Sequence, residues 1–208
     1  MIECDVNIHK EQFERDGYTV FHNFIDQKDV HRMARRMHYL RQSNGYTVDG
    51  QCPGSMAVYS DPIHSEMQEK YRKQLEGTVG LELLPTYTYA RWYNPKEVLK
   101  KHTDRPACEI SMTVTLEYDT FDGNPWPIYA GGGEAFSLQP GSVMIYRGCD
   151  VPHWRDQFVG IFQTQAFIHY VDANGPYKKF KYDCRPSLGA SLNAQDTKKF
   201  MKLTKKHG

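Results

Sequence analysis

The sequence has almost no excess of charge of either sign, since its 208 residues include 26 Lys and Arg against 25 Asp and Glu. A dedicated nucleic-acid-binding protein holds phosphates with a clear basic excess, so this balance argues against a nucleic-acid partner. The sequence also lacks any run of about 18 apolar residues that could cross a bilayer. Its first residues contain neither the apolar stretch nor the small-residue cleavage site of a signal peptide. We therefore expect a cytoplasmic protein with no membrane partner.

Paired cysteines are missing as well. The five cysteines are odd in number, widely spaced and never arranged as Cys-x-x-Cys: Cys4, Cys52, Cys108, Cys149 and Cys184. This spacing argues against both a disulfide framework and a thiolate zinc site. We expect all five to be reduced thiols.

Apolar residues, in contrast, are sufficient for a core, because 39% of the residues are hydrophobic and 13% are aromatic. A chain of this length fits one domain, so we expect residues 1–208 to form a single domain. About the first 80 residues predict a helical layer. Apolar residues recur there at the spacing of one helix face: Val30, Met33, Ala34, Met37 and Leu40. A second helix is predicted to begin after Asp61, at Pro62, and to close at Gly77.

A β structure is predicted from about residue 83 to about residue 172. The chain there alternates with period two and is rich in β-branched and aromatic residues, in the runs TYTYARWY, EISMTVTLEY, WPIYA, EAFSL, SVMIY and GIFQTQAFIHYV. Short strands separated by turns such as FDGNP, GGG and QPG are typical of a double-sheet barrel or sandwich, and no helical crossover for a parallel sheet is present. The basic C-terminal segment, 185–208, has two interpretations, a solvated terminus or a nucleic-acid contact.

His102 and Asp104, in the segment KKHTDRP, are the most informative pair for chemistry. Residues two apart on an extended strand point to the same side. Two histidines and one carboxylate form a site suited to Fe(II), with open positions for substrate and O2. Among the later histidines outside the C-terminal tail, only His153 and His169 could supply the third ligand, and His153 is favoured because it follows a turn, a strand and a second turn. In the alternative interpretation, all are ordinary polar residues of a β-sandwich.

Three segments carry a resemblance to a known family. These are FERDGYTVFHNFI, LLPTYTYARWYNPKEVLKKHTDRPACEISMTVTL and LQPGSVMIYRGCDVPHW. They resemble the opening segment, the strand and His-x-Asp region, and the distal histidine region of the 2-oxoglutarate- and Fe(II)-dependent oxygenases, in particular the prolyl-hydroxylase-like and phytanoyl-CoA-dioxygenase-like branches. The resemblance implies an α+β fold, a double-stranded β-helix (jelly-roll, cupin-like) supported by N-terminal helices. It also implies that His102, Asp104 and His153 are the catalytic metal ligands.

The resemblance further implies an oxidoreductase, a dioxygenase that uses Fe(II), 2-oxoglutarate and O2, with ascorbate as a candidate reductant. Oxidation of the cosubstrate would release succinate and CO2 while a substrate is hydroxylated. Related halogenases bind chloride in place of the carboxylate ligand. Asp104 therefore favours hydroxylation over halogenation.

One part of the family pattern is missing. The family places an Arg or Lys about ten residues after the distal histidine, where it pairs with the 5-carboxylate of 2-oxoglutarate, but residues 162–165 here contain no cation. A glutamine only weakly imitates the bidentate contact of a guanidinium, so another basic residue must serve. Arg155 is the first candidate, because it lies two residues after His153. Arg105 and Arg91 are the alternatives.

Three further residues are candidates for the cosubstrate pocket. Tyr93 lies where the family often has a tyrosine that hydrogen-bonds the cosubstrate, although core packing is an equal alternative. Gln163 and His169 would face the pocket together if no bulge intervenes in their strand.

The substrate is left open between a peptidyl side chain, with proline preferred, and a small metabolite. Variable loops bind the substrate in this family, here residues 43–60 and 119–133. The alternative function is a non-catalytic cupin-like metal- or ligand-binding module.

Overall fold

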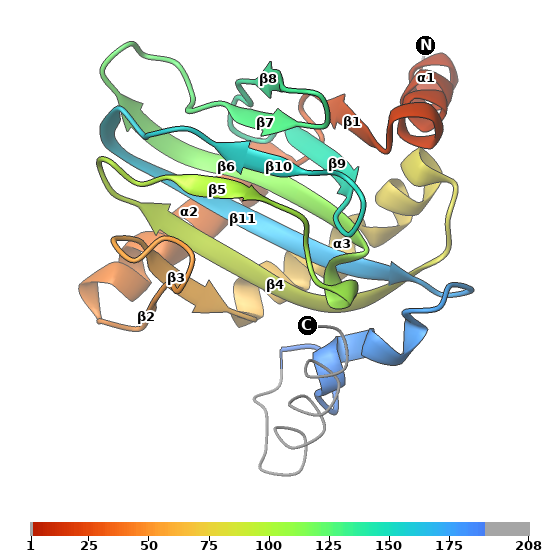
Figure 1. The fold of residues 1–208 in the computed structure, drawn as a ribbon. Coiled ribbons are helices and arrows are strands. Elements are labelled where there is room, and N and C mark those ends of the chain that lie inside the picture. The colour runs from red at the N-terminus through yellow and green to blue at the C-terminus, as the bar shows by residue number, and fades with distance from the viewer. Residues whose placement is uncertain (1, 190–208) are drawn as a thin grey trace.

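The computed structural model describes residues 2–189 of the protein. Two antiparallel sheets face one another, with three helices against the outer side of the larger sheet (Figure 1). The larger sheet has the strand order β1-β9-β6-β11-β4-β3-β2, and the smaller has the order β5-β10-β7-β8. This arrangement confirms the predicted double-stranded β-helix.

The strands of the larger sheet come from both halves of the chain. They are β1 (Tyr18–Phe21), β2 (Thr47–Val48), β3 (Met56–Tyr59), β4 (Leu83–Tyr93), β6 (Ile110–Thr120), β9 (Val143–Arg147) and β11 (Gly160–Asp172). The smaller sheet comes from the second half alone. Its strands are β5 (Leu99–His102), β7 (Ile128–Ala130), β8 (Glu134–Phe136) and β10 (His153–Arg155).

The central strand β11 lies between β4 and β6 and is buried along nearly its whole length. Burial on both faces requires two covers. The helices supply one, and the smaller sheet supplies the other (Figure 1). The space between the two sheets is therefore where inward-facing polar side chains of β4 and β11 meet those of β5 and β10.

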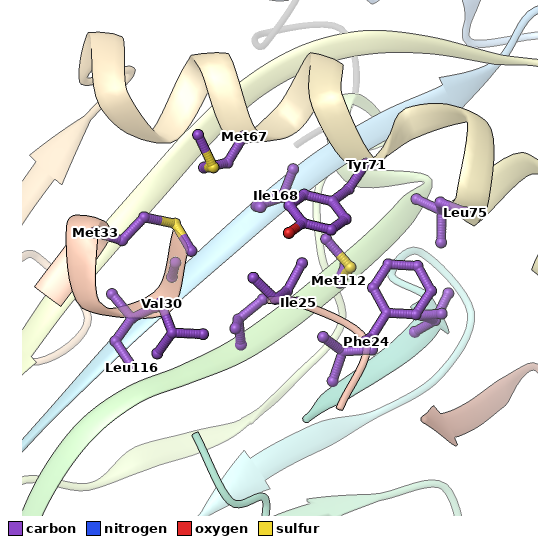
Figure 2. Packing of buried hydrophobic residues seen from close by; sticks show 14 of the residues in the cluster. Phe24, Ile25, Val30, Met33, Met67, Tyr71, Leu75, Met112, Leu116 and Ile168 are labelled. Carbon is purple, nitrogen blue, oxygen red and sulfur yellow. The ribbon is translucent and has the colours of Figure 1, made fainter. Parts of the chain in front are cut away.

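The helical cover consists of α1 (Ile2–Asp16), α2 (Gln27–Gln42) and α3 (Pro62–Val79). The predicted apolar stripe of α2 is buried from Val30 to Leu40. Figure 2 shows Met33 of α2 and Tyr71 of α3 packed above Met112 and Ile168 of the sheet.

Two expectations for the N-terminal half are corrected. Helix α3 does not close at Gly77 but continues to Val79, because Gly80 adopts the left-handed conformation (φ 70°) that ends the helix. The helical layer is also interrupted by β1, β2 and β3, short strands that pair with one another or with β4 and β9. Strands of two to four residues are too short to give a periodic signal.

Two short 3-10 helices complete the described chain, η1 (Pro106–Cys108) and η2 (Lys178–Cys184). Within the part of the chain that the structure describes, no helix is long and apolar enough to cross a membrane. The basic segment 185–208 lies outside the described residues from position 190 onward.

Candidate active site between the sheets

The three predicted metal ligands lie together where β5 ends and β10 begins. His102 ends β5 and His153 begins β10, and the two residues are direct partners in the antiparallel ladder. Asp104 follows β5 by two residues, and its Oδ1 lies 3.7 Å from the Nε2 of each histidine. The ligand atoms of all three residues lie within 4.8 Å of one another, close enough to hold a single ion.

Backbone carbonyl groups orient both imidazole rings. The Nδ1 of His102 donates to the carbonyl of Lys100 at 2.7 Å, and the Nδ1 of His153 donates to the carbonyl of Val151 at 3.0 Å. A carbonyl oxygen only accepts, so the proton of each neutral ring is on Nδ1. Each Nε2 therefore presents its lone pair towards Asp104.

The electrostatics of this cluster suit a divalent cation. Burial lowers the pKa of His102 and lowers that of His153 to about 4, so both imidazoles are neutral at neutral pH. Burial raises the pKa of Asp104 to about 6. Among the described residues, no Lys or Arg forms an ion pair with Asp104, so the buried carboxylate lacks a directly bound counter-charge. Two imidazole nitrogens and one carboxylate oxygen are a ligand set that fits Fe(II).

The second oxygen of Asp104 is held from the opposite side. The hydroxyl of Ser111 donates to Oδ2 of Asp104 at 3.3 Å and also lies 2.8 Å from Nδ1 of His169. The backbone N–H of Asp104 donates to the carbonyl of Gly148 at 2.7 Å. A Cβ at Gly148 would lie 2.7 Å from Oδ2 of Asp104 and 2.2 Å from the carbonyl oxygen of Cys108, so only glycine fits there.

A cavity of about 440 Å³ opens onto this cluster. Its walls come from the loop before β3, from β3, β4, β5, β9, β10 and β11, and from the segment after β5. The lining residues are Asp49, Gly50, Gln51, Tyr59, Tyr87, Tyr89, Arg91, Leu99, His102, Asp104, Arg105, Tyr146, His153, Phe167 and His169. Of the two loops expected to bind substrate, residues 43–60 therefore contribute to the cavity, whereas no residue of 119–133 lines it.

Arg155 lies on the same strand as His153 and is 1% exposed. One guanidinium nitrogen donates to the carbonyl of Trp126, while Nε and Nη2 have no hydrogen-bond partner among residues 2–189. Burial without a carboxylate partner lowers the pKa of Arg155 to about 10. A buried guanidinium with two unused donors is a strong site for a carboxylate.

The two alternative cations are already paired. Arg91 donates from Nε to Asp49 at 2.6 Å, and Arg105 makes two hydrogen bonds of 2.8 Å to Asp183. Arg155 is thus the one of the three predicted arginines that has no carboxylate partner among the described residues.

Only some of the predicted pocket residues line the cavity. His169 lines the cavity, as do Arg91 and Arg105, but Gln163, Tyr93 and Arg155 are not among its lining residues. Gln163 accepts a hydrogen bond from the backbone N–H of Trp126 at 2.8 Å, and the buried Tyr93 hydroxyl accepts one from Arg91 at 3.2 Å. Between Gln163 and His169 the extra residues of the bulges lie on the neighbouring strands β4 and β6, whereas the bulge at the start of β11 lies on β11 itself, at Ile161.

A second group of metal-binding side chains shares Asp104 and adds Cys108 and His169. Burial raises the pKa of Cys108 well above its ordinary value, so its thiol is protonated, and it lies 3.0 Å from the hydroxyl of Tyr87. Because metal ions bind the thiolate, the group formed with His102 and His153 is the better metal site.

Sequence reasoning did not identify Ser111, Asp49 or Asp183 as residues of this site. Asp49 and Asp183 are about 40 and 80 residues from the arginines they bind, as their sequence numbers show. Ser111 lies in a β-strand run without any motif. No spacing rule connects these residues to the site, so only the folded chain could reveal them.

Comparison with known proteins gives a match at the level of structure alone. No family model matches the chain, and no curated protein matches its sequence. A Pseudomonas putida prolyl-4-hydroxylase superposes with a TM-score of 0.63 at 12% identity, over 80% of this chain and 98% of that one.

Two further solved structures are similar. A Trichoplax adhaerens prolyl hydroxylase, in complex with a hypoxia inducible factor oxygen degradation domain peptide fragment, has a TM-score of 0.66 at 12% identity, over 86% of this chain and 92% of that one. The epimerase SnoN, in complex with Fe3+, alpha ketoglutarate and nogalamycin RO, has a TM-score of 0.68 at 13% identity, over 92% of this chain and 94% of that one. The chain therefore has the double-stranded β-helix fold of the 2-oxoglutarate- and Fe(II)-dependent oxygenases.

Proposed function

We propose that this protein is an Fe(II)- and 2-oxoglutarate-dependent dioxygenase that hydroxylates a peptidyl or small-molecule substrate. The observation that carries the proposal is the cluster of His102, Asp104 and His153, whose ligand atoms converge at the cavity in a fold shared with such enzymes. Prolyl hydroxylases among the similar structures favour a peptidyl substrate, and SnoN favours a small molecule. A prolyl side chain remains our preferred peptidyl target, and relatedness to the phytanoyl-CoA branch remains a prediction.

Each residue has a definite task in this proposal. The Nε2 atoms of His102 and His153 and Oδ1 of Asp104 would hold Fe(II) and leave open positions for cosubstrate and O2. Bound Fe(II) and 2-oxoglutarate would, with O2, supply an oxidative decarboxylation that yields succinate and CO2 and leaves the second oxygen atom of O2 for insertion into a substrate C–H bond. Ser111 holds the other oxygen of Asp104, which fixes the direction of the ligand.

Arg155 would bind the 5-carboxylate of 2-oxoglutarate through its two unused donors. The buried rings of Trp126 and Tyr93 exclude water from the surroundings of this guanidinium, which strengthens a charge-assisted hydrogen bond. The cosubstrate roles of Tyr93, Gln163 and His169 remain proposals, and Arg105 and Arg91 remain the alternatives for the clamp.

The test is succinate formation from 2-oxoglutarate by the protein purified without oxygen and then supplied with Fe(II), ascorbate and air. We expect succinate to form slowly alone and faster with a true substrate, which should gain the mass of one oxygen atom. Asp104→Ala is the matched control and should form none. A protein that binds metal but forms no succinate under any of these conditions would instead be the cupin-like binding module.

A further inference from the structure

The cavity wall beyond the metal ligands is largely aromatic. Tyr59 and Tyr87 stack with their ring centres 5.1 Å apart, and Tyr89 and Phe167 line the cavity with them. Such a wall packs well against a flat or cyclic apolar group.

Both arginines of the cavity wall are neutralised by buried carboxylates of the same chain. Asp49 is 2% exposed and accepts from Arg91, while Asp183 is fully buried and accepts two hydrogen bonds from Arg105. Two acidic partners therefore cancel the two positive charges that an anionic substrate would need.

The remaining ionisable groups of the lining, outside the metal ligands, are uncharged at neutral pH. Burial lowers the pKa of His169 well below its ordinary value, so its ring is neutral. Burial and the neighbouring carboxylates raise the pKa of Tyr59 and Tyr89, and burial does the same for Tyr87. A charged substrate group would enter this space without a counter-charge, which is costly.

Two tyrosine hydroxyls have their protons committed to these carboxylates. Tyr59 donates to Asp183 at 2.5 Å, and Tyr89 donates to Asp49 at 2.7 Å. A hydroxyl has one proton to donate and lone pairs that accept. These two oxygens can therefore only accept further hydrogen bonds, so they complement a ligand with N–H or O–H groups.

We propose that the substrate group that enters this cavity is uncharged, has an apolar face and donates hydrogen bonds, as an amide or an alcohol does. The pairs Asp49–Arg91 and Asp183–Arg105 would set this selectivity by leaving neither an anion nor a cation a partner. This inference rests on the proposed function for the identity of the site, but charge selectivity can be measured without turnover.

The test compares three ligands with one ring and different charge: cyclohexanecarboxamide, cyclohexanecarboxylate and cyclohexylmethylamine. Binding is followed by ligand-observed NMR on the protein loaded with Zn(II) and N-oxalylglycine, and again on the metal-free protein. We expect the amide to bind about tenfold or more tightly than either charged ligand. Equal binding of a charged ligand, or no binding of the amide, would overturn the proposal.

Two variants test the assigned residues. Asp183→Asn leaves Arg105 without its carboxylate partner. The affinity for the carboxylate ligand, relative to that for the amide, should therefore rise about tenfold. Asp49→Asn should act in the same way through Arg91, and it replaces Asp183→Asn as the test if that variant does not fold. Asp119→Asn, at an exposed position of β6, is the matched control and should leave the ratio unchanged. If neither site variant changes the ratio, the two ion pairs do not set the selectivity.

This outcome is separable from that of the proposed function. If the protein forms no succinate but still binds the three ligands with the expected charge selectivity, the dioxygenase is rejected and the cavity assignment stays in place. Succinate formation without charge selectivity would do the reverse.

Discussion

Asp104 is held from three directions, which makes it the residue that organises the site. Its Oδ1 faces the two histidines, its Oδ2 accepts from Ser111, and its backbone N–H donates to Gly148. Neighbours that fix a metal ligand in this way typically change metal affinity by about 10- to 100-fold when they are altered. The proposed metal site therefore depends on more residues than its three candidate ligands.

Replacing Asp104 should separate metal binding from folding. Asp104→Ala removes one of three ligands, so Mn(II) affinity and succinate formation should be lost. Because burial raises the pKa of Asp104 above its unfolded value, to about 6, the ionised carboxylate destabilises the metal-free fold at neutral pH. We therefore expect the metal-free variant to unfold in urea at the same concentration as the wild type or a higher one. Normal decarboxylation of 2-oxoglutarate by the variant would show that the metal site is elsewhere.

Replacing Arg155 should weaken the binding of the cosubstrate and leave metal binding unchanged. Truncating one partner of a buried charge pair costs about 2 to 5 kcal/mol. At about 1.4 kcal/mol per tenfold, Arg155→Ala should raise the 2-oxoglutarate concentration needed for half-maximal succinate formation by roughly one to three orders of magnitude. Mn(II) affinity should be nearly unchanged, and Arg155→Lys should recover only part of the loss, since an ammonium is a point charge.

Arg105→Ala and Arg91→Ala are the comparison for this prediction. If either of them raises the 2-oxoglutarate requirement while Arg155→Ala does not, the carboxylate clamp is that other arginine. Succinate formation at several 2-oxoglutarate concentrations distinguishes the three.

For individual residues, the sequence predicted which side chains come together at the candidate metal site but not the residues that surround them. His102 and Asp104 were predictable because residues two apart on a strand share a side. Arg155 could be nominated but not separated from Arg91 and Arg105, because the separation depends on which arginines already have carboxylates. Those carboxylates come from a loop and from η2, which no spacing rule connects to the arginines.

Among the secondary-structure elements, α3 shows how one side chain fixes the start of a helix. Asp61 accepts from the backbone N–H of Ile63 at 3.0 Å, from Arg36 at 2.8 Å and from His64 at 3.2 Å. Burial alone would raise the pKa of this carboxyl, but the hydrogen bonds from His64 and Arg36 outweigh it and lower the pKa to about 2. Asp61 therefore links α3 to α2 as well as capping it.

This lowered pKa predicts a loss of stability in acid. The folded pKa lies below the unfolded value of about 3.9, so the contribution of Asp61 is complete above pH 4 and is lost as the pH falls towards 2. The difference corresponds to roughly 2 kcal/mol of unfolding free energy. Urea unfolding at several pH values should show this loss in the wild type. In Asp61→Asn, the free energy of unfolding should fall less steeply as the pH is lowered. Asp119→Asn, at an exposed carboxyl, should retain the wild-type dependence of the unfolding free energy on pH. The same pH dependence in both variants would contradict the assignment.

The elements that the sequence did not predict are those fixed by distant partners. The apolar stripe of α2 and the long strands β4, β6 and β11 were visible as periodic patterns. Strands β1 and β3 contain four residues each and exist because β9 and β4 supply their hydrogen bonds. The end of α3 was misplaced because Gly77 and Gly80 are both suitable by type, and only the backbone conformation distinguishes them.

In the molecule as a whole, the two sheets have different tasks. The larger sheet packs its outer face on the helices through the buried cluster of Figure 2 and so serves as the support. The smaller sheet carries His102, His153 and Arg155 on β5 and β10. Ligands bound between the sheets would therefore connect the supporting half of the molecule to the half that carries the proposed metal ligands.

This arrangement predicts that metal and cosubstrate stabilise the whole fold. A ligand that binds only the folded state at 100 times its dissociation constant adds about 2.7 kcal/mol, which raises Tm by about 5 to 10 °C in a protein of this size. Mn(II) alone should raise the Tm, and Mn(II) with N-oxalylglycine should raise it further, as measured by differential scanning fluorimetry. Asp104→Ala should show neither increase in Tm. Arg155→Ala should keep the increase in Tm caused by Mn(II) and lose the further increase caused by N-oxalylglycine. A wild-type protein that responds to Mn(II) and not to the analogue would be a metal-binding module without a cosubstrate site.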